Sequence, residues 1–288
     1  MDRKKIVSSL ITMGAAGALL IGATFAFFTD NETSTGNTFT AGGLDLKVDS
    51  ESHYAGLTCD GEVWDEDEEG QSTRPDLVGD PCDGTWTETD LGPQHKFFNL
   101  SDIKPGDTGE NTISLHVVNN DAWGRLVIDN DQDLENTFLQ SELDSGNDPD
   151  GVASGELQEN LLFRIWLDQG NVDGFQCSDG AEVAKCIDDP QEGDNIQQGN
   201  EPTLVSQGTL DAGGETLNIW EGLAAVFVSQ GASNGIVADG RMVESITYYF
   251  GIDWELPGDV GNEVQTDSLS ADMTFEVEQH RNNPIPFD

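Results

Sequence analysis

The chain has very little positive charge. Its 288 residues include 12 Lys and Arg against 55 Asp and Glu, which gives a formal net charge of −43. A surface of this sign repels nucleic acid, so nucleic-acid binding is excluded as a function. Repulsion among so many like charges destabilises a compact state in dilute buffer, whereas at molar salt the Debye length falls to about 3 Å. The composition predicts a halophilic, archaeal-type protein.

Signatures of catalytic and cofactor sites are also missing. The four histidines, at positions 53, 95, 116 and 280, form no HExxH pair, and no two of them have a spacing that suits zinc binding on one helix face. No nucleophile elbow, phosphate-binding loop or dinucleotide fingerprint follows an expected strand. We therefore expect neither an enzyme nor a bound cofactor.

Cysteine is scarce but even in number. The four cysteines fall into two local pairs, Cys59 with Cys82 and Cys177 with Cys186, and neither pair has the two-residue spacing of a zinc knuckle. An even count in an exported protein favours disulfides. Three pairings of four cysteines are possible. We prefer the one with two local disulfides, because each disulfide would then close one surface loop.

The N-terminus has the three parts of a secretory signal. A basic head at residues 3–5 precedes an apolar stretch at residues 6–28, and small residues end at Ala26, just before Phe27. Cleavage between Ala26 and Phe27 is expected to release a secreted, extracellular or cell-surface protein without membrane contact. The alternative is a retained anchor, since residues 6–28 could span a bilayer.

The remaining sequence predicts an all-β fold, a β-sandwich or jelly roll. Alternating apolar and polar residues mark half-buried strands, and no βαβ alternation is present. We expect a signal peptide at 1–26, a donor-strand segment at 27–40, and one domain at 41–288 with insertions near 50–94 and 130–160. A short amphipathic helix is expected over 134–143. The expected strands are 43–50, 95–100, 111–119, 125–129, 161–168, 216–220, 242–255 and 268–280.

Two kinds of surface site have weaker signals. Asp168, Asn171 and Asp173 gather oxygen ligands before a glycine turn, as a calcium loop does, but their spacing does not match an EF-hand. Solvated Asp-Gly turns are the alternative. Asn31 and Asn99 begin N-x-[ST] sequons, which mark glycosylation acceptors but also occur by chance.

Three blocks resemble the TasA/camelysin family of exported, fibre-forming proteins. Residues 38–46 read T-F-x-A-G-x-L-D-L, and residues 99–121 contain an L-x-P-G-D-like turn followed by a strand and an N-N-x turn. Residues 248–283 are similar to the family's final strand pair. The blocks cover about a third of the chain. The acidic insertion at 50–94 and the paired cysteines depart from the family pattern.

The resemblance implies a jelly-roll subunit that polymerises head to tail by donor-strand complementation. Each chain's N-terminal segment would complete a neighbour's sheet, which gives an open filament. The partner is then the chain itself, with other biofilm-matrix or cell-surface components as further partners. The residues expected in assembly are Phe27, Phe28, Thr29, Asn31, Thr33, Thr35 and Phe39.

Two other functions stay open at this point. A monomeric adhesin or carbohydrate-binding surface protein would need an exposed aromatic platform, for which Trp64 and Trp86 are the candidates. A secreted camelysin-like metallopeptidase is the least favoured, because the sequence has no matching zinc motif.

Overall fold

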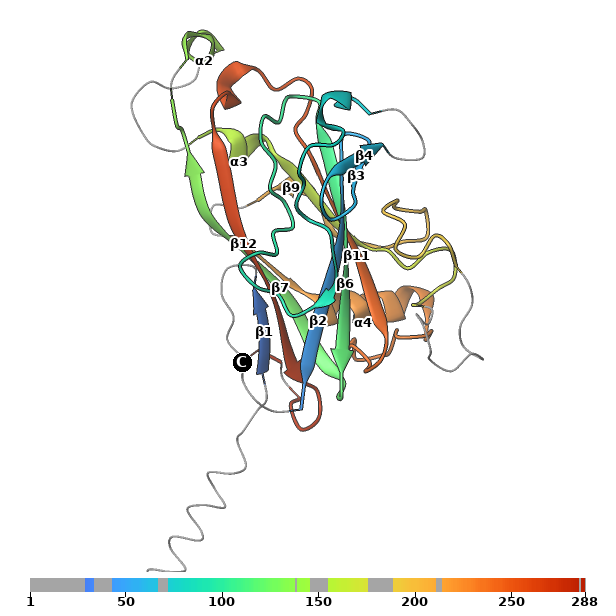
Figure 1. Cartoon of the computed structure of the whole chain (residues 1–288). Coiled ribbons are helices and arrows are strands. Elements are labelled where there is room, and N and C mark those ends of the chain that lie inside the picture. Colours follow the sequence, from blue (N-terminus) through green and yellow to red (C-terminus); the bar gives the residue numbers. More distant parts are fainter. Residues whose placement is uncertain are drawn as a thin grey trace, which may run out of the picture.

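The chain folds as two antiparallel β-sheets with the hydrophobic core between them (Figure 1). The computed structural model describes residues 29–33, 43–66, 72–137, 139–145, 155–175, 189–210, 214–284 and 286–287. This architecture confirms the prediction of an all-β sandwich. None of the helices in these ranges is long and apolar enough to cross a membrane.

The smaller sheet has four strands in the order β1-β12-β7-β10. In that order their bounds are Thr29–Thr33, Ser268–Gln279, Ala122–Leu134 and Glu215–Asn218. The larger sheet has the order β4-β3-β2-β6-β11-β8-β9, and β5 also pairs with β2. Its strands are β2 (Asp45–Tyr54), β3 (Leu57–Cys59), β4 (Trp64–Glu66), β5 (Trp86–Thr89), β6 (Thr108–Val118), β8 (Leu162–Leu167), β9 (Thr203–Thr209) and β11 (Thr247–Glu255).

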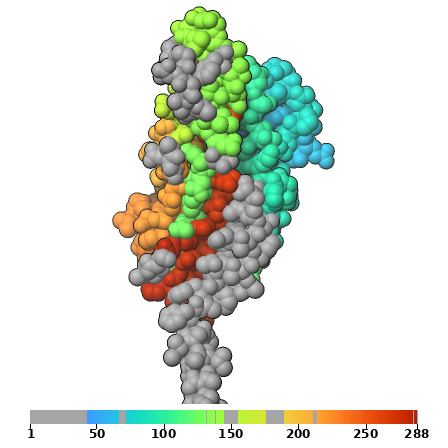
Figure 2. All heavy atoms as spheres, turned by 90° about the vertical axis from the view of Figure 1, so that its left-hand side faces the viewer, coloured from blue at the N-terminus to red at the C-terminus, as the bar shows by residue number. Residues whose placement is uncertain are grey.

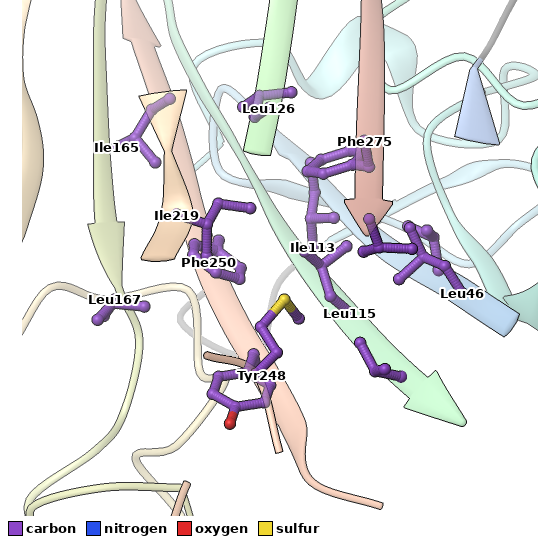
Figure 3. Packing of buried hydrophobic residues seen from close by; sticks show 14 of the residues in the cluster. Leu46, Ile113, Leu115, Leu126, Ile165, Leu167, Ile219, Tyr248, Phe250 and Phe275 are labelled. Atoms are coloured by element: carbon purple, nitrogen blue, oxygen red, sulfur yellow. The ribbon is translucent and has the colours of Figure 1, made fainter. Parts of the chain in front are cut away.

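Alternating side chains of both sheets fill the core. Figure 3 shows Leu46, Ile113 and Leu115 of the larger sheet close to Leu126 and Phe275 of the smaller one. All five are buried. Each such side chain contributes roughly 1.5–3 kcal/mol when it leaves water. Because a strand exposes alternate residues on opposite faces, the alternation in the sequence fixes which face of β2, β6 and β12 points inward.

A second cluster of buried residues anchors the segment that follows β2. Trp64 packs near Tyr54, with ring centroids 6.0 Å apart, and only 5% of Trp64 is exposed. A disulfide joins Cys59 to Cys82 and confirms that predicted pair. Trp86 is half-buried, and its indole N–H donates to the carbonyl oxygen of Val48. The proposed carbohydrate platform of Trp64 and Trp86 is therefore wrong, because both rings are packed against the fold.

Three local expectations are also wrong. Residues 95–100 form no strand; instead Phe97 enters the core, 5.8 Å from the ring of Phe275. The strand expected at 216–220 ends at Asn218, where helix α4 (Ile219–Gln230) begins. The helix expected over 134–143 is shorter and later, since β7 continues to Leu134 and α2 spans Gln140–Ser145. The other helices are η1 (Pro75–Leu77), α3 (Leu157–Asn160) and η2 (Asn262–Val264).

Candidate assembly site at the edge of β12

Strand β12 has a long neighbour on one side and a short one on the other. β7 pairs with it from Ser268 to Gln279, whereas β1 pairs only from Thr274 to Glu278. Figure 1 shows β1 beside the lower half of β12, and Figure 2 shows β12 (red) next to β7 (green) on the face turned to the viewer. The edge of β12 is thus the place where this fold takes up an N-terminal strand.

The two faces of β12 differ in chemistry. Met273, Phe275 and Val277 are buried on the inner face. The outer face carries acidic residues, of which Glu276 forms an ion pair with Arg125 of β7. A strand that pairs with β12 therefore meets apolar positions on one face and negative charge on the other.

Strand β1 is polar along its whole length. Its five residues, Thr29–Thr33, include no apolar side chain. The register places Asp30 across from Val277 and Glu32 across from Phe275. Residues directly opposite in an antiparallel pair belong to the same face of the sheet. Asp30 and Glu32 are thus the register partners of two buried residues of β12.

The structure places three of the seven predicted assembly residues. Thr29, Asn31 and Thr33 lie in β1, across from Glu278, Glu276 and Thr274. The sequence identified this segment as a donor but not the edge that receives it. The remaining assembly residues and the predicted cleavage site lie outside the described residues: Ala26, Phe27, Phe28, Thr35 and Phe39.

The second predicted disulfide lies outside the described residues, whereas the sequon at Asn99 lies within them. Cys177 and Cys186 lie outside the described residues, so their pairing stays a prediction. Asn99 is exposed, and its side-chain amide donates to a carboxylate oxygen of Asp83 at 2.6 Å. Glycosylation at Asn99 would compete with this contact. Glycosylation at Asn31 and Asn99 stays a prediction.

The predicted calcium loop contains one buried and two exposed ligand candidates. Asp168 is fully buried, and its carboxylate accepts the backbone N–H groups of Gly193 (2.8 Å) and Asn195 (3.2 Å). Asn171 and Asp173 are exposed. The Asp168 carboxylate already has backbone donors, and calcium binding by this loop stays a prediction.

Asp168 also forms a buried acid pair that sequence analysis missed. Its carboxyl group is hydrogen-bonded to Glu201, which itself accepts the N–H groups of Gly170 and Gln198. Burial raises the pKa of Glu201 to about 8 and that of Asp168 to about 6. Two buried acids in contact disfavour ionisation of both, which is why the pKa of each is raised.

The histidines and a serine motif do not assemble into a catalytic site in the described part of the chain. The one group of three metal-ligating side chains found there, Glu135 with Glu156 and Asp267, contains no histidine. A GxSxG sequence occurs at 231–235, but it follows helix α4, whereas a nucleophile elbow joins a strand to a helix. Gly231 ends that helix with a φ of 98°.

The comparison with known families agrees with the N-terminal blocks. Residues 2–54 match the family model of the camelysin metallo-endopeptidases. The N-terminal part of the chain is thus similar to the camelysin family. The matched span contains β1 and ends with the last residue of β2, so it includes the strand that occupies the β12 edge. A search among curated proteins finds no match to the chain.

Proposed function

We propose that this chain is the structural subunit of an extracellular or cell-surface filament of a biofilm matrix, and that it polymerises by strand donation. After export and cleavage, the N-terminal segment would leave its own sheet and pair with β12 of the next subunit. The observation that carries the proposal is the pairing of a short, polar N-terminal strand with the β12 edge. The camelysin-like match over the same segment supports it.

Exchange of β1 between chains is energetically easy. A strand without apolar residues loses little burial when it leaves, and the ladder hydrogen bonds that it gives up are made again on the neighbour's β12. A head-to-tail contact of this kind does not close on itself, so it produces fibres.

Cross-linking between two variant chains tests strand donation directly. Thr33 lies across from Thr274 in the β1–β12 register. We expect that mixing chains carrying Thr33→Cys with chains carrying Thr274→Cys, followed by assembly and oxidation, yields disulfide-linked dimers and longer ladders. The measurement is non-reducing electrophoresis with mapping of the linked peptides. A matched control pairs Thr33→Cys with Ser270→Cys, which lies four residues from the register position.

Electron microscopy of a truncated chain gives a second readout. Deletion of Phe27 to Thr35 should leave a folded monomer that forms no filaments, and a peptide of this segment should slow assembly of the intact chain. Filaments of normal appearance from the truncated protein would refute donation from this end. Cross-links confined to single chains of a Thr33→Cys, Thr274→Cys double variant would refute exchange between subunits.

A further inference from the structure

Strands β1 and β12 carry charge of the same sign and yet pair along one sheet edge. The sequence of β1 contains two acids, Asp30 and Glu32, and β12 contains three, whereas neither strand has a basic residue. Asn31 stands between the two acids of β1, and its register partner on β12 is Glu276. Because charges of one sign on adjacent strands repel, pairing at this edge requires that the negative charge of β12 be offset.

Arg125 of β7 offsets the first of these charges. Glu276 has Arg125 as its register partner on one side and Asn31 on the other, so the three lie in one row across the sheet. The Nε–H group of Arg125 donates to the carboxylate of Glu276, and the two side chains form an ion pair. Only 29% of the Arg125 side chain and 19% of the Glu276 side chain are exposed, and such partial burial strengthens the attraction between the two charges.

The segment that follows β12 folds back and supports this arrangement. Glu278 is the register partner of the first residue of β1, and its Oε2 atom accepts the side-chain amide of Asn283 at 2.8 Å and the backbone N–H of Phe287 at 2.9 Å. The carbonyl oxygen of Asn283 accepts the indole N–H of Trp123 at 2.8 Å, which ties this segment to β7. The ring of Phe287 lies against the guanidinium of Arg125, whose central carbon is 4.3 Å from the ring centroid. Both glutamates of β12 in the ladder with β1 therefore have donors from other parts of the chain.

We propose that Arg125 is a positioning residue of the β12 edge, which accepts an acidic strand because Arg125 neutralises Glu276. Without the guanidinium, a partly buried carboxylate would stand uncompensated across from the middle of an acidic segment, which is costly. Phe287 and Asn283 act through their contacts, since they hold the Arg125 guanidinium and the Glu278 carboxylate in place.

The role of Arg125 applies to strand uptake within one chain and between chains. The structure contains the β1–β12 pairing within one chain, so the assignment itself does not depend on polymerisation. In a filament the incoming strand would be the same acidic segment of a second chain, and Arg125 would offset the same repulsion there. This second consequence rests on the proposed function.

Amide hydrogen exchange of residues 29–33 in the intact chain, measured at 0.5 M and 3 M NaCl, tests the assignment. Salt screens the repulsion that an unpaired Glu276 would cause, so Arg125→Gln should speed exchange at least about tenfold at 0.5 M but less than about threefold at 3 M. Arg125→Lys keeps the positive charge, and the double variant Arg125→Gln, Glu276→Gln removes both charges, so each should exchange nearly as the parent does. Arg164→Gln is the matched control, because it breaks a comparable ion pair with Asp253 in the larger sheet and should leave the exchange of β1 unchanged.

The dependence on salt separates charge neutralisation from simple packing. Equal exchange in the parent and in Arg125→Gln at 0.5 M would overturn the assignment. An increase that is the same at both salt concentrations, or that Glu276→Gln does not relieve, would show a packing role and would also overturn it. An increase confined to 0.5 M and relieved by both Arg125→Lys and the double variant supports it. Electron micrographs of the same samples report on assembly separately, because a parent chain that forms no filaments would refute strand donation and leave the exchange result standing.

Discussion

At the scale of single residues, burial decides the charge of a few carboxylates. Asp168 and Glu201 are buried, and burial raises the pKa of both, whereas most of the described acids are at least partly exposed. The prediction of Asp168 as a calcium ligand rests on its neighbours along the chain. Its actual contacts, Gly193 and Asn195, come from a loop far along the sequence, which local patterns do not encode.

The Glu201 pair predicts a dependence of stability on pH. Because the folded-state pKa of Glu201 is raised, folding binds a proton that the unfolded chain releases. This stabilisation is complete below the unfolded pKa, near 4.5, and is lost as pH rises through about 8. Between pH 6 and 8 the free energy of unfolding should fall with a slope of up to about 1.4 kcal/mol per pH unit.

Denaturant titrations at fixed high salt measure this slope. Glu201→Gln mimics the protonated acid and should flatten it, while Glu62→Gln removes one exposed charge and should leave it unchanged. An equal slope in the parent and in Glu201→Gln would assign the dependence to other acids.

At the scale of elements, clean alternation was a reliable guide. β6 and β12 lie almost where the alternation in the sequence predicts them, although residues 111–115 of β6 are buried on both faces. Helix α4 was missed since its apolar run IWEGLAAVFV reads equally well as a buried strand. The β1 pairing could not be predicted in detail, because a polar five-residue segment has no periodicity that selects a partner edge.

The stability of the segment after β2 depends on its disulfide. The Cys59–Cys82 disulfide spans 23 residues and attaches β3 to the segment beyond β4. Replacing both cysteines by alanine should lower the free energy of unfolding by about 3 kcal/mol in the loop-entropy description. Equilibrium denaturation measures the loss, and hydrogen exchange should show faster opening of β3 and β4 with β12 still protected. An unchanged free energy of unfolding would mean that the packing of Trp64 is sufficient to keep the segment after β2 in place.

At the scale of the whole molecule, the main feature is the large net negative charge. Twelve basic residues cannot balance 55 acids, and several of the basic residues already serve ion pairs such as Arg125 with Glu276 and Arg164 with Asp253. The excess is spread over both sheets and the loops between them. Folding therefore gathers negative charge into a small volume, and the surrounding electrolyte has to screen it.

This charge predicts that low salt destabilises the fold. The Debye length is about 10 Å at 0.1 M and about 3 Å at 1 M, so most of the gain from screening should occur below 1 M. The melting temperature followed by circular dichroism should rise steeply from 0.05 to 1 M NaCl. Above 1 M the further change should be small and should depend on the type of salt, because it then reflects apolar burial.

Sucrose is the matched control for this experiment. It strengthens apolar burial by exclusion from the protein surface but does not screen charge, so it should not replace NaCl below 1 M. Because like-charged chains must also approach one another to polymerise, filaments observed by electron microscopy should need the same salt range as the monomer fold or a higher one. A melting temperature that stays constant from 3 M to 0.05 M NaCl would show that the acidic surface does not govern stability.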